Sequence, residues 1–152
     1  MAKNFNGTQI NSSVTIAEKA GAAINDGRNR IFKYDENGDV VLATAGTDIP
    51  VGIALIEAGY NDISGAESGK LAKGDQVDIQ VKDIGYVLAG AEIKKGQEVT
   101  AGADGLAAVA VAGNYVMGVA LGAAQKDEYC RIQIAKYQKA SAAASGEPGV
   151  GA

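Results

Sequence analysis

The sequence predicts an all-β fold, a compact β-barrel or sandwich built from two related β-units that arose by internal duplication. Glycine is abundant, with 21 residues in a chain of 152, whereas proline occurs twice. β-Branched residues are spread evenly between the glycines, and this composition favours many short strands joined by glycine-containing turns. Asn37-Gly38 and Asp104-Gly105 are the dipeptides most typical of two-residue β-hairpin turns.

The duplication is visible as four phrases that occur in both halves of the chain and in the same order. In the first half they are AGAAINDG (20–27), NGDVVLATAG (37–46), VGIAL (51–55) and IQV (79–81), and in the second half AGAEIKKG (89–96), DGLAAVAVAG (104–113), MGVAL (117–121) and IQI (132–134). The distance between partners falls from 69 to 67, 66 and 53 residues, so three deletions relate the copies. We therefore expect one β-unit over about 14–81 and a second over about 83–134.

Each copy contains the same succession of elements. An extended apolar segment leads into the A-G-A corner, a strand follows a glycine turn, and an Asn-Gly or Asp-Gly turn leads to the next strand. The G-[IV]-A-L strand comes after it, and a strand that alternates polar and apolar residues closes the copy, as in QVDIQV (76–81). About ten strands are expected in all. The alternative over residues 12–24 is one short helix capped by Ser12 or Ser13, but the matching segment in copy two is typical of a strand.

Two arms are expected to flank a β-domain of residues 14–135. Residues 1–13 are polar and have no counterpart in copy two, and residues 136–152 form a low-complexity tail of small residues. Neither segment has enough apolar surface to fold alone, so we expect flexible N- and C-terminal arms.

Residues 105–124 carry no charge over a length that could cross a bilayer. Gly113-Asn114 divides this stretch into two short apolar runs, which favours a buried hairpin and predicts no membrane partner. The first residues lack the apolar run of a secretory signal, so we expect synthesis in the cytoplasm.

The composition argues against an enzyme and against a metal or cofactor site. The chain contains no histidine, and Cys130 is its one cysteine, so the usual general base and the usual zinc ligands are absent. The segment DENGD (35–39) lacks the ligand spacing of a calcium loop, and Leu71 stands where a phosphate-binding loop needs Ser or Thr. A net charge of −4 opposes binding to nucleic acid.

One alternative is a small β-barrel carrier or ligand-binding domain. AGAEIKKGQEVTAGADG (89–105) resembles the first part of biotinyl and lipoyl carrier domains, in which a hairpin tip bears a modified lysine. The tip here is Ala103-Asp104-Gly105, however, and Lys94 and Lys95 lie at a different turn.

The succession A-G-A-x-I-x-x-G-x-x-V, a D-G or N-G turn, an Ala/Val run ending in A-G, then G-[IV]-A-L and a final alternating strand resembles the capsid cement, or decoration, proteins of tailed bacteriophages. The resemblance covers about residues 14–135. It implies a structural protein of the virion surface, a homotrimer at threefold or quasi-threefold positions, which bridges subunits of the major capsid protein and stabilises the expanded head. We expect Phe5 and Ile10 to be apolar anchors on the capsid and Lys3 to be a charge contact.

Overall fold

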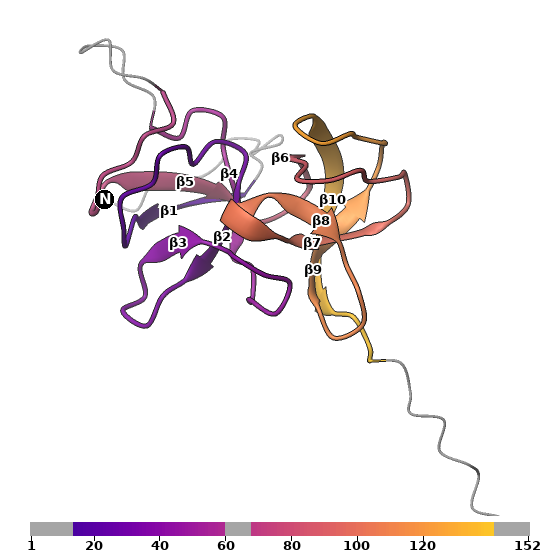
Figure 1. Ribbon diagram of the computed structural model, residues 1–152. Helices are drawn as coiled ribbons and strands as arrows, with labels where there is room; N and C mark the ends of the chain where they lie inside the picture. The colour runs from indigo at the N-terminus through magenta and orange to yellow at the C-terminus, as the bar shows by residue number, and fades with distance from the viewer. Residues whose placement is uncertain (1–13, 60–67, 142–152) are drawn as a thin grey trace, which may run out of the picture.

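The computed structural model describes residues 14–59 and 68–141, and these form two five-stranded antiparallel sheets (Figure 1). Unit one contains β1 (Thr15–Lys19), β2 (Ile31–Tyr34), β3 (Val40–Leu42), β4 (Gly52–Ala54) and β5 (Gln76–Gln80). Unit two contains β6 (Ile84–Leu88), β7 (Glu98–Ala101), β8 (Ala107–Val109), β9 (Tyr115–Ala120) and β10 (Tyr129–Gln138), with a 3-10 turn, η1 (Ala103–Gly105), between β7 and β8. The all-β prediction is confirmed.

The two units have the same strand topology. The order is β1-β5-β4-β2-β3 in unit one and β6-β10-β9-β7-β8 in unit two, so strands at equal places in the chain occupy equal places in the sheet. In each unit a parallel bridge joins the two edges, Ala20 to Val40 and Ala89 to Ala107. Each sheet therefore curls into a small barrel, and the predicted pair of related units is confirmed.

The repeated A-G-A-x-I phrase is a corner with the same hydrogen bonds in both units. Ile24 exchanges two backbone hydrogen bonds with Leu71, as Ile93 does with Ala124, and both isoleucines are buried. The correspondence changes after the isoleucine, because unit one has two more residues before the next strand. Asn29, with φ 52°, donates to Ala54 O just as Gly96, with φ 88°, donates to Ala120 O. The residue of unit one that is equivalent to Gly96 is therefore Asn29 and not Gly27. Asn and Gly can replace each other at this position because both readily adopt positive φ.

The extended segment predicted before the A-G-A corner is confirmed: residues 15–19 form β1, which pairs along its length with β5, so the helix alternative is wrong. The predicted hairpin of residues 105–124 is wrong, because β7 lies between β8 and β9. β8 pairs with β7 on one side and bridges to Ala89 on the other, so neither of its edges is free for β9. β9 pairs instead with the other edge of β7.

The last strand extends beyond the predicted domain boundary at residue 135. β10 runs to Gln138, and Lys139 still exchanges backbone hydrogen bonds with Gly113 and Asn114. The predicted N-terminal arm, residues 1–13, and residues 142–152 of the predicted C-terminal tail lie outside the described residues.

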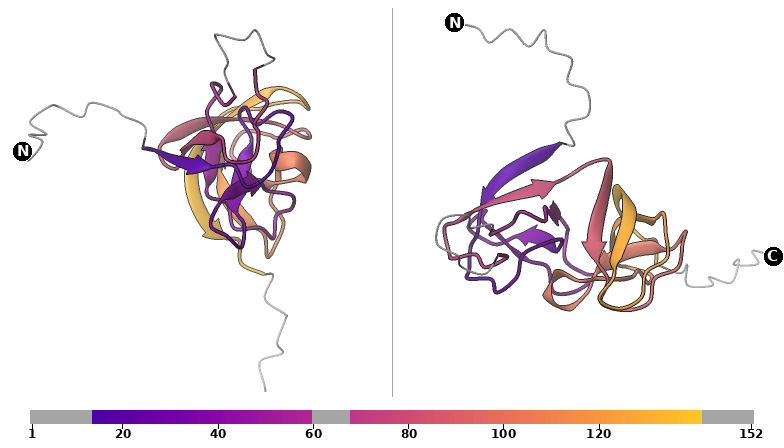
Figure 2. Two further views of the ribbon diagram at one scale, coloured as in Figure 1. Left: turned by 90° about the vertical axis from the view of Figure 1, so that its left-hand side faces the viewer. Right: turned by 90° about the horizontal axis from the view of Figure 1, so that it is seen from above.

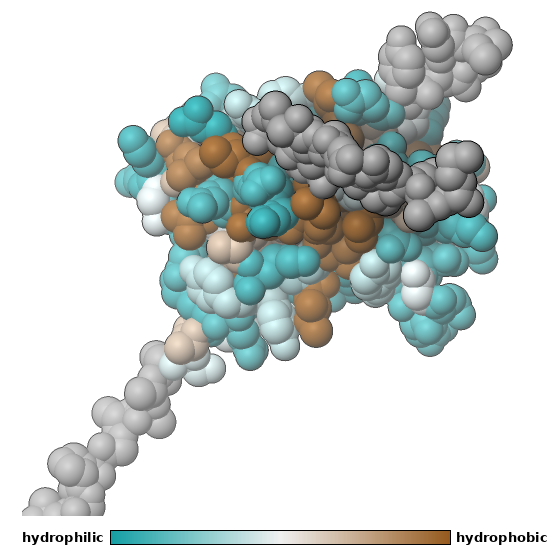
Figure 3. Space-filling view, turned by 180° about the vertical axis from the view of Figure 1, so that it is seen from behind, coloured by the Kyte–Doolittle hydropathy of each residue, from teal (hydrophilic) through white to brown (hydrophobic). Residues whose placement is uncertain are grey.

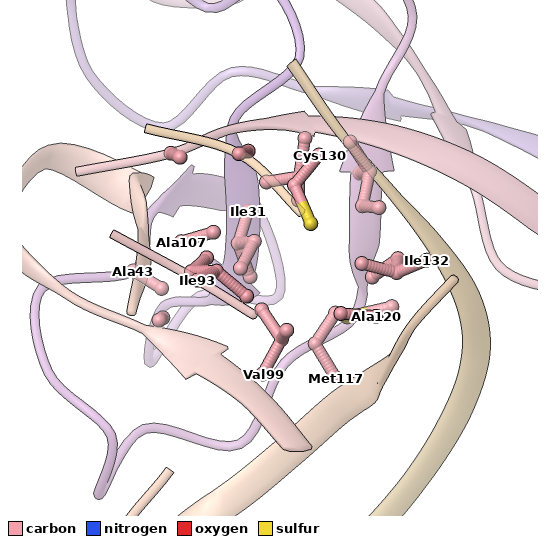
Figure 4. Packing of buried hydrophobic residues seen from close by; sticks show 14 residues of the cluster. Ile31, Ala43, Ile93, Val99, Ala107, Met117, Ala120, Cys130 and Ile132 are labelled. Atoms are coloured by element: carbon pink, nitrogen blue, oxygen red, sulfur yellow. The ribbon is translucent and has the colours of Figure 1, made fainter. Parts of the chain in front are cut away.

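The barrels lie side by side along the long axis of the molecule (Figures 1 and 2). They share part of their core. Unit one has a core of its own that includes Phe32, Val40 and Ile79. A second core, centred on unit two, also takes in Ile31 and Ala43 from unit one, which lie against Ile93 and Ala107 in Figure 4. Ile53 of β4 belongs to this second core as well. Shared apolar burial therefore joins the units into one folded body.

Candidate functional site

The seam between the units is held by hydrogen bonds around Asn29. Its backbone carbonyl accepts from the Leu88 N–H at 2.9 Å, and its side-chain Nδ2 donates to Tyr86 O at 3.0 Å. Both partners belong to β6, so unit one covers part of an otherwise open sheet edge. Further contacts across the seam are Gly105 N–H to Ala43 O, Tyr115 N–H to Gly46 O, Arg30 Nη1 to Asp104 O and Lys136 Nζ to Val51 O.

A groove of about 440 Å³ opens at this seam. Unit one contributes Asn29, Gln80 and residues 53–57, and unit two contributes Tyr86 and Tyr129. Asn29 and Gln80 are buried, and Asn29 Oδ1 has no hydrogen-bond partner among the described residues. The groove has the mostly apolar, concave character of a binding site.

A second hollow of about 660 Å³ includes the Lys33–Asp48 ion pair, whose Nζ and Oδ1 lie 2.8 Å apart. Burial alone would raise the pKa of Asp48, but donors from Lys33, Thr44 and Ala45 outweigh it and lower the pKa to about 2. These hydrogen bonds tie the carboxylate to its own loop and to Lys33 of β2. We assign Asp48 a structural role, since its acceptor capacity is already used.

A third polar cluster fastens the end of β10. Glu98 accepts hydrogen bonds from Lys139 Nζ at 2.6 Å and from the Tyr137 hydroxyl at 2.8 Å. The hydrogen bond from Lys139 and, to a smaller extent, the one from Tyr137 lower the pKa of Glu98. The hydrogen bond that Tyr137 donates to Glu98 raises the pKa of the tyrosine hydroxyl. The cluster holds residues 137–139 on unit two.

The described residues show no cluster suited to metal binding. Among residues 14–59 and 68–141, no three His, Cys, Asp or Glu side chains gather in a group that could hold a metal ion. Cys130 is buried, and burial raises the pKa of its thiol, which disfavours the reactive thiolate. In the same residues, no helix has the length and apolar character needed to span a membrane.

The residues singled out in the sequence fall into two groups. Lys3, Phe5 and Ile10 lie outside the described residues, so their capsid contact stays a prediction. Lys94 and Lys95 are exposed in the turn before β7, whereas the β7–β8 tip is docked on unit one through Asp104 and Gly105. A carrier domain needs a hairpin tip that is free and bears a lysine, whereas this tip is docked on unit one and contains no lysine.

The groove at the seam was not predicted from the sequence. Tyr86 and Tyr129 lie on strands of unit two, and residues 53–57 belong to unit one, so the groove exists only once the barrels are docked.

Comparison with solved structures finds a phage protein of the same fold. The base of the head fibre protein gp8.5 of bacteriophage phi29 superposes with a TM-score of 0.59 at 26% sequence identity. The match covers 82% of this chain and 98% of that chain. No protein-family model and no curated protein sequence matches. The similarity supports a structural protein associated with a phage head.

Proposed function

We propose that this protein is a structural decoration protein of a phage head, which binds the outer surface of the shell and stabilises it by bridging major capsid subunits. The observation that carries the proposal is the similarity to the phi29 head fibre base over nearly the whole of that chain. The proposed role needs no catalytic group. Its proposed partners are the major capsid protein and further copies of itself, as a homotrimer at threefold or quasi-threefold positions.

The architecture is suited to this role. Two barrels joined through a common core form one folded body, and several large apolar side chains remain on its surface, including Ile49, Ile56 and Ile84. Exposed apolar side chains that gather in patches mark protein contact surfaces. A head protein can cover them when it binds the shell.

The proposal is tested by adding purified full-length protein to expanded heads of the parent phage that were prepared without it. We expect saturable co-sedimentation with the heads and a higher temperature of head disruption after binding. Absence of co-sedimentation at saturating protein would contradict the proposal.

A second candidate is the base of a head fibre, because the similar phi29 protein is described as one. A fibre base and a cement protein would both co-sediment with heads. They differ in the second measurement, because a fibre base alone should leave the temperature of head disruption unchanged.

A further inference from the structure

Unit two carries an apolar outer sheet face that unit one lacks. We define the outer face as Ile84, Tyr86 and Leu88 of β6 together with Tyr129 and Arg131 of β10. Tyr129 pairs with Leu88 and Arg131 with Tyr86, so these side chains are cross-strand neighbours on one side of the sheet. Ile84, Tyr86 and Tyr129 are 52%, 53% and 54% exposed, which is high for side chains of this size.

The duplicated unit supplies an internal comparison. β1 and β5 pair in the same register as β6 and β10, so residues 69 positions apart in β1 and β6, and 53 apart in β5 and β10, are equivalent. The equivalents of Ile84, Tyr86, Leu88, Tyr129 and Arg131 are Thr15, Ala17, Lys19, Gln76 and Asp78. All five of these unit-one residues are exposed.

At these five positions unit one therefore carries polar side chains apart from Ala17, and unit two carries large apolar or aromatic ones apart from Arg131, although the exposed Gln133 lies opposite Ile84. Packing inside the barrel cannot explain the difference, because these side chains point away from the core in both units. Figure 3 shows hydrophobic surface, interrupted by hydrophilic side chains, on the back of the molecule. An apolar patch that the fold does not need indicates a contact with another molecule.

The groove at the seam adjoins this face, because Tyr86 and Tyr129 belong to both. A groove of about 440 Å³ whose lining includes two aromatic side chains can take a large apolar side chain of a partner, which is the usual form of an interface hot spot. Within the described part of the chain, neither tyrosine hydroxyl has a hydrogen-bond partner.

Arg131 indicates which charge a partner of this face should carry. It is exposed, and its guanidinium forms no ion pair or hydrogen bond with any residue that the structure describes. A guanidinium among apolar neighbours favours a carboxylate opposite it.

We propose that the outer face of unit two is the surface that docks on the phage head, against a shell protein that presents a large apolar side chain beside a carboxylate. This inference rests on the proposed function and adds to it the surface and the chemistry of the contact. The equivalent face of unit one, on β1 and β5, is polar and is not part of the proposed contact.

The test replaces outer-face residues by those that unit one already carries. Tyr86→Ala with Tyr129→Gln removes the two aromatic side chains that line the groove, and Arg131→Asp reverses the charge. The matched control is Lys19→Ala with Gln76→Ala at the equivalent face of unit one. Each full-length variant is titrated onto undecorated heads of the parent phage, its unfolding midpoint is compared with that of the wild type, and its mass is measured by sedimentation velocity.

We expect both outer-face variants to weaken head binding about tenfold or more at an unchanged unfolding midpoint, and the control to bind like the wild type. Wild-type binding by the outer-face variants would overturn the inference and leave the proposed function intact. A wild type that does not bind heads would overturn both. Unchanged head binding with a loss of oligomer mass would assign the face to contacts between copies, and would also overturn the inference.

Discussion

At the scale of single residues, Asp48 of unit one and Asn114 of unit two occupy equivalent positions and hold the same kind of turn. They lie 66 residues apart, as the G-[IV]-A-L strands do, and each accepts a hydrogen bond from the backbone N–H three residues earlier, Ala45 or Val111. Side chains of Asp and Asn commonly hold turns in this way. The negative charge, and with it the contact to Lys33, is particular to unit one.

Replacing Asp48 by Asn should keep the turn and remove the ion pair. The folded pKa of about 2 lies below the ordinary 3.8, so the carboxylate stabilises the fold above about pH 5 and loses this effect as the pH falls toward 2. We expect Asp48→Asn to lower the free energy of unfolding by at most about 2 kcal/mol at pH 7. Asp48→Ala, which also removes the turn hydrogen bonds, should cost more.

Denaturant unfolding at pH 7 and at about pH 2.5 measures this effect. The difference between wild type and Asp48→Asn should shrink at the lower pH. A difference of the same size at both values would show that the charge of Asp48 contributes nothing.

At the scale of the elements, the G-[IV]-A-L motif is explained by a close strand contact. A Cβ atom at Gly52 would collide with the carbonyl oxygen of Gln80, and one at Gly118 with that of Gln133. Gln80 and Gln133 are equivalent residues of β5 and β10. The repeated glycine is therefore required by the packing of β4 on β5 and of β9 on β10.

Gly52→Ala and Gly118→Ala should each lower the free energy of unfolding by about 1–3 kcal/mol or more, because the added methyl group forces the strands apart. Gly122→Ala is the control, since its added Cβ would meet no atom within 4 Å. Thermal unfolding of the three variants gives the comparison. Equal effects at all three glycines would refute the proposed cause.

At the scale of the whole molecule, the shared core predicts cooperative unfolding. Ile53 comes from β4 of unit one but packs in the core of unit two. Ile53→Ala should lower the free energy of unfolding by about 2–5 kcal/mol. Hydrogen exchange should show reduced protection in both barrels together. Loss of protection in unit one alone would mean that the barrels unfold independently.

The sequence allowed the strands, the duplication and the hairpin turns to be predicted, because these depend on local patterns such as Asn37-Gly38 and the alternation in QVDIQV. The sequence did not allow the position of β9 in the sheet, between β10 and β7, to be predicted. Gly113-Asn114 has the composition of a hairpin turn, and only the pairing of β8 with β7 and its bridge to Ala89 exclude the hairpin.

The outer face could have been found from the sequence, in part, by comparing the two copies position by position. The change from Ala17 to Tyr86 is visible once the copies are aligned, but exposure of both residues follows only from the strand register. The groove beside Tyr86 depends on how the barrels dock, and no local pattern encodes that arrangement.

The most direct test of the central claim is a cryo-electron microscopy reconstruction of undecorated parent-phage heads after incubation with the full-length protein. We predict added two-lobed density on the outer surface of the shell at threefold or quasi-threefold positions, with unit two against the shell. Heads that gain no density on their outer surface at saturating protein would contradict the assignment.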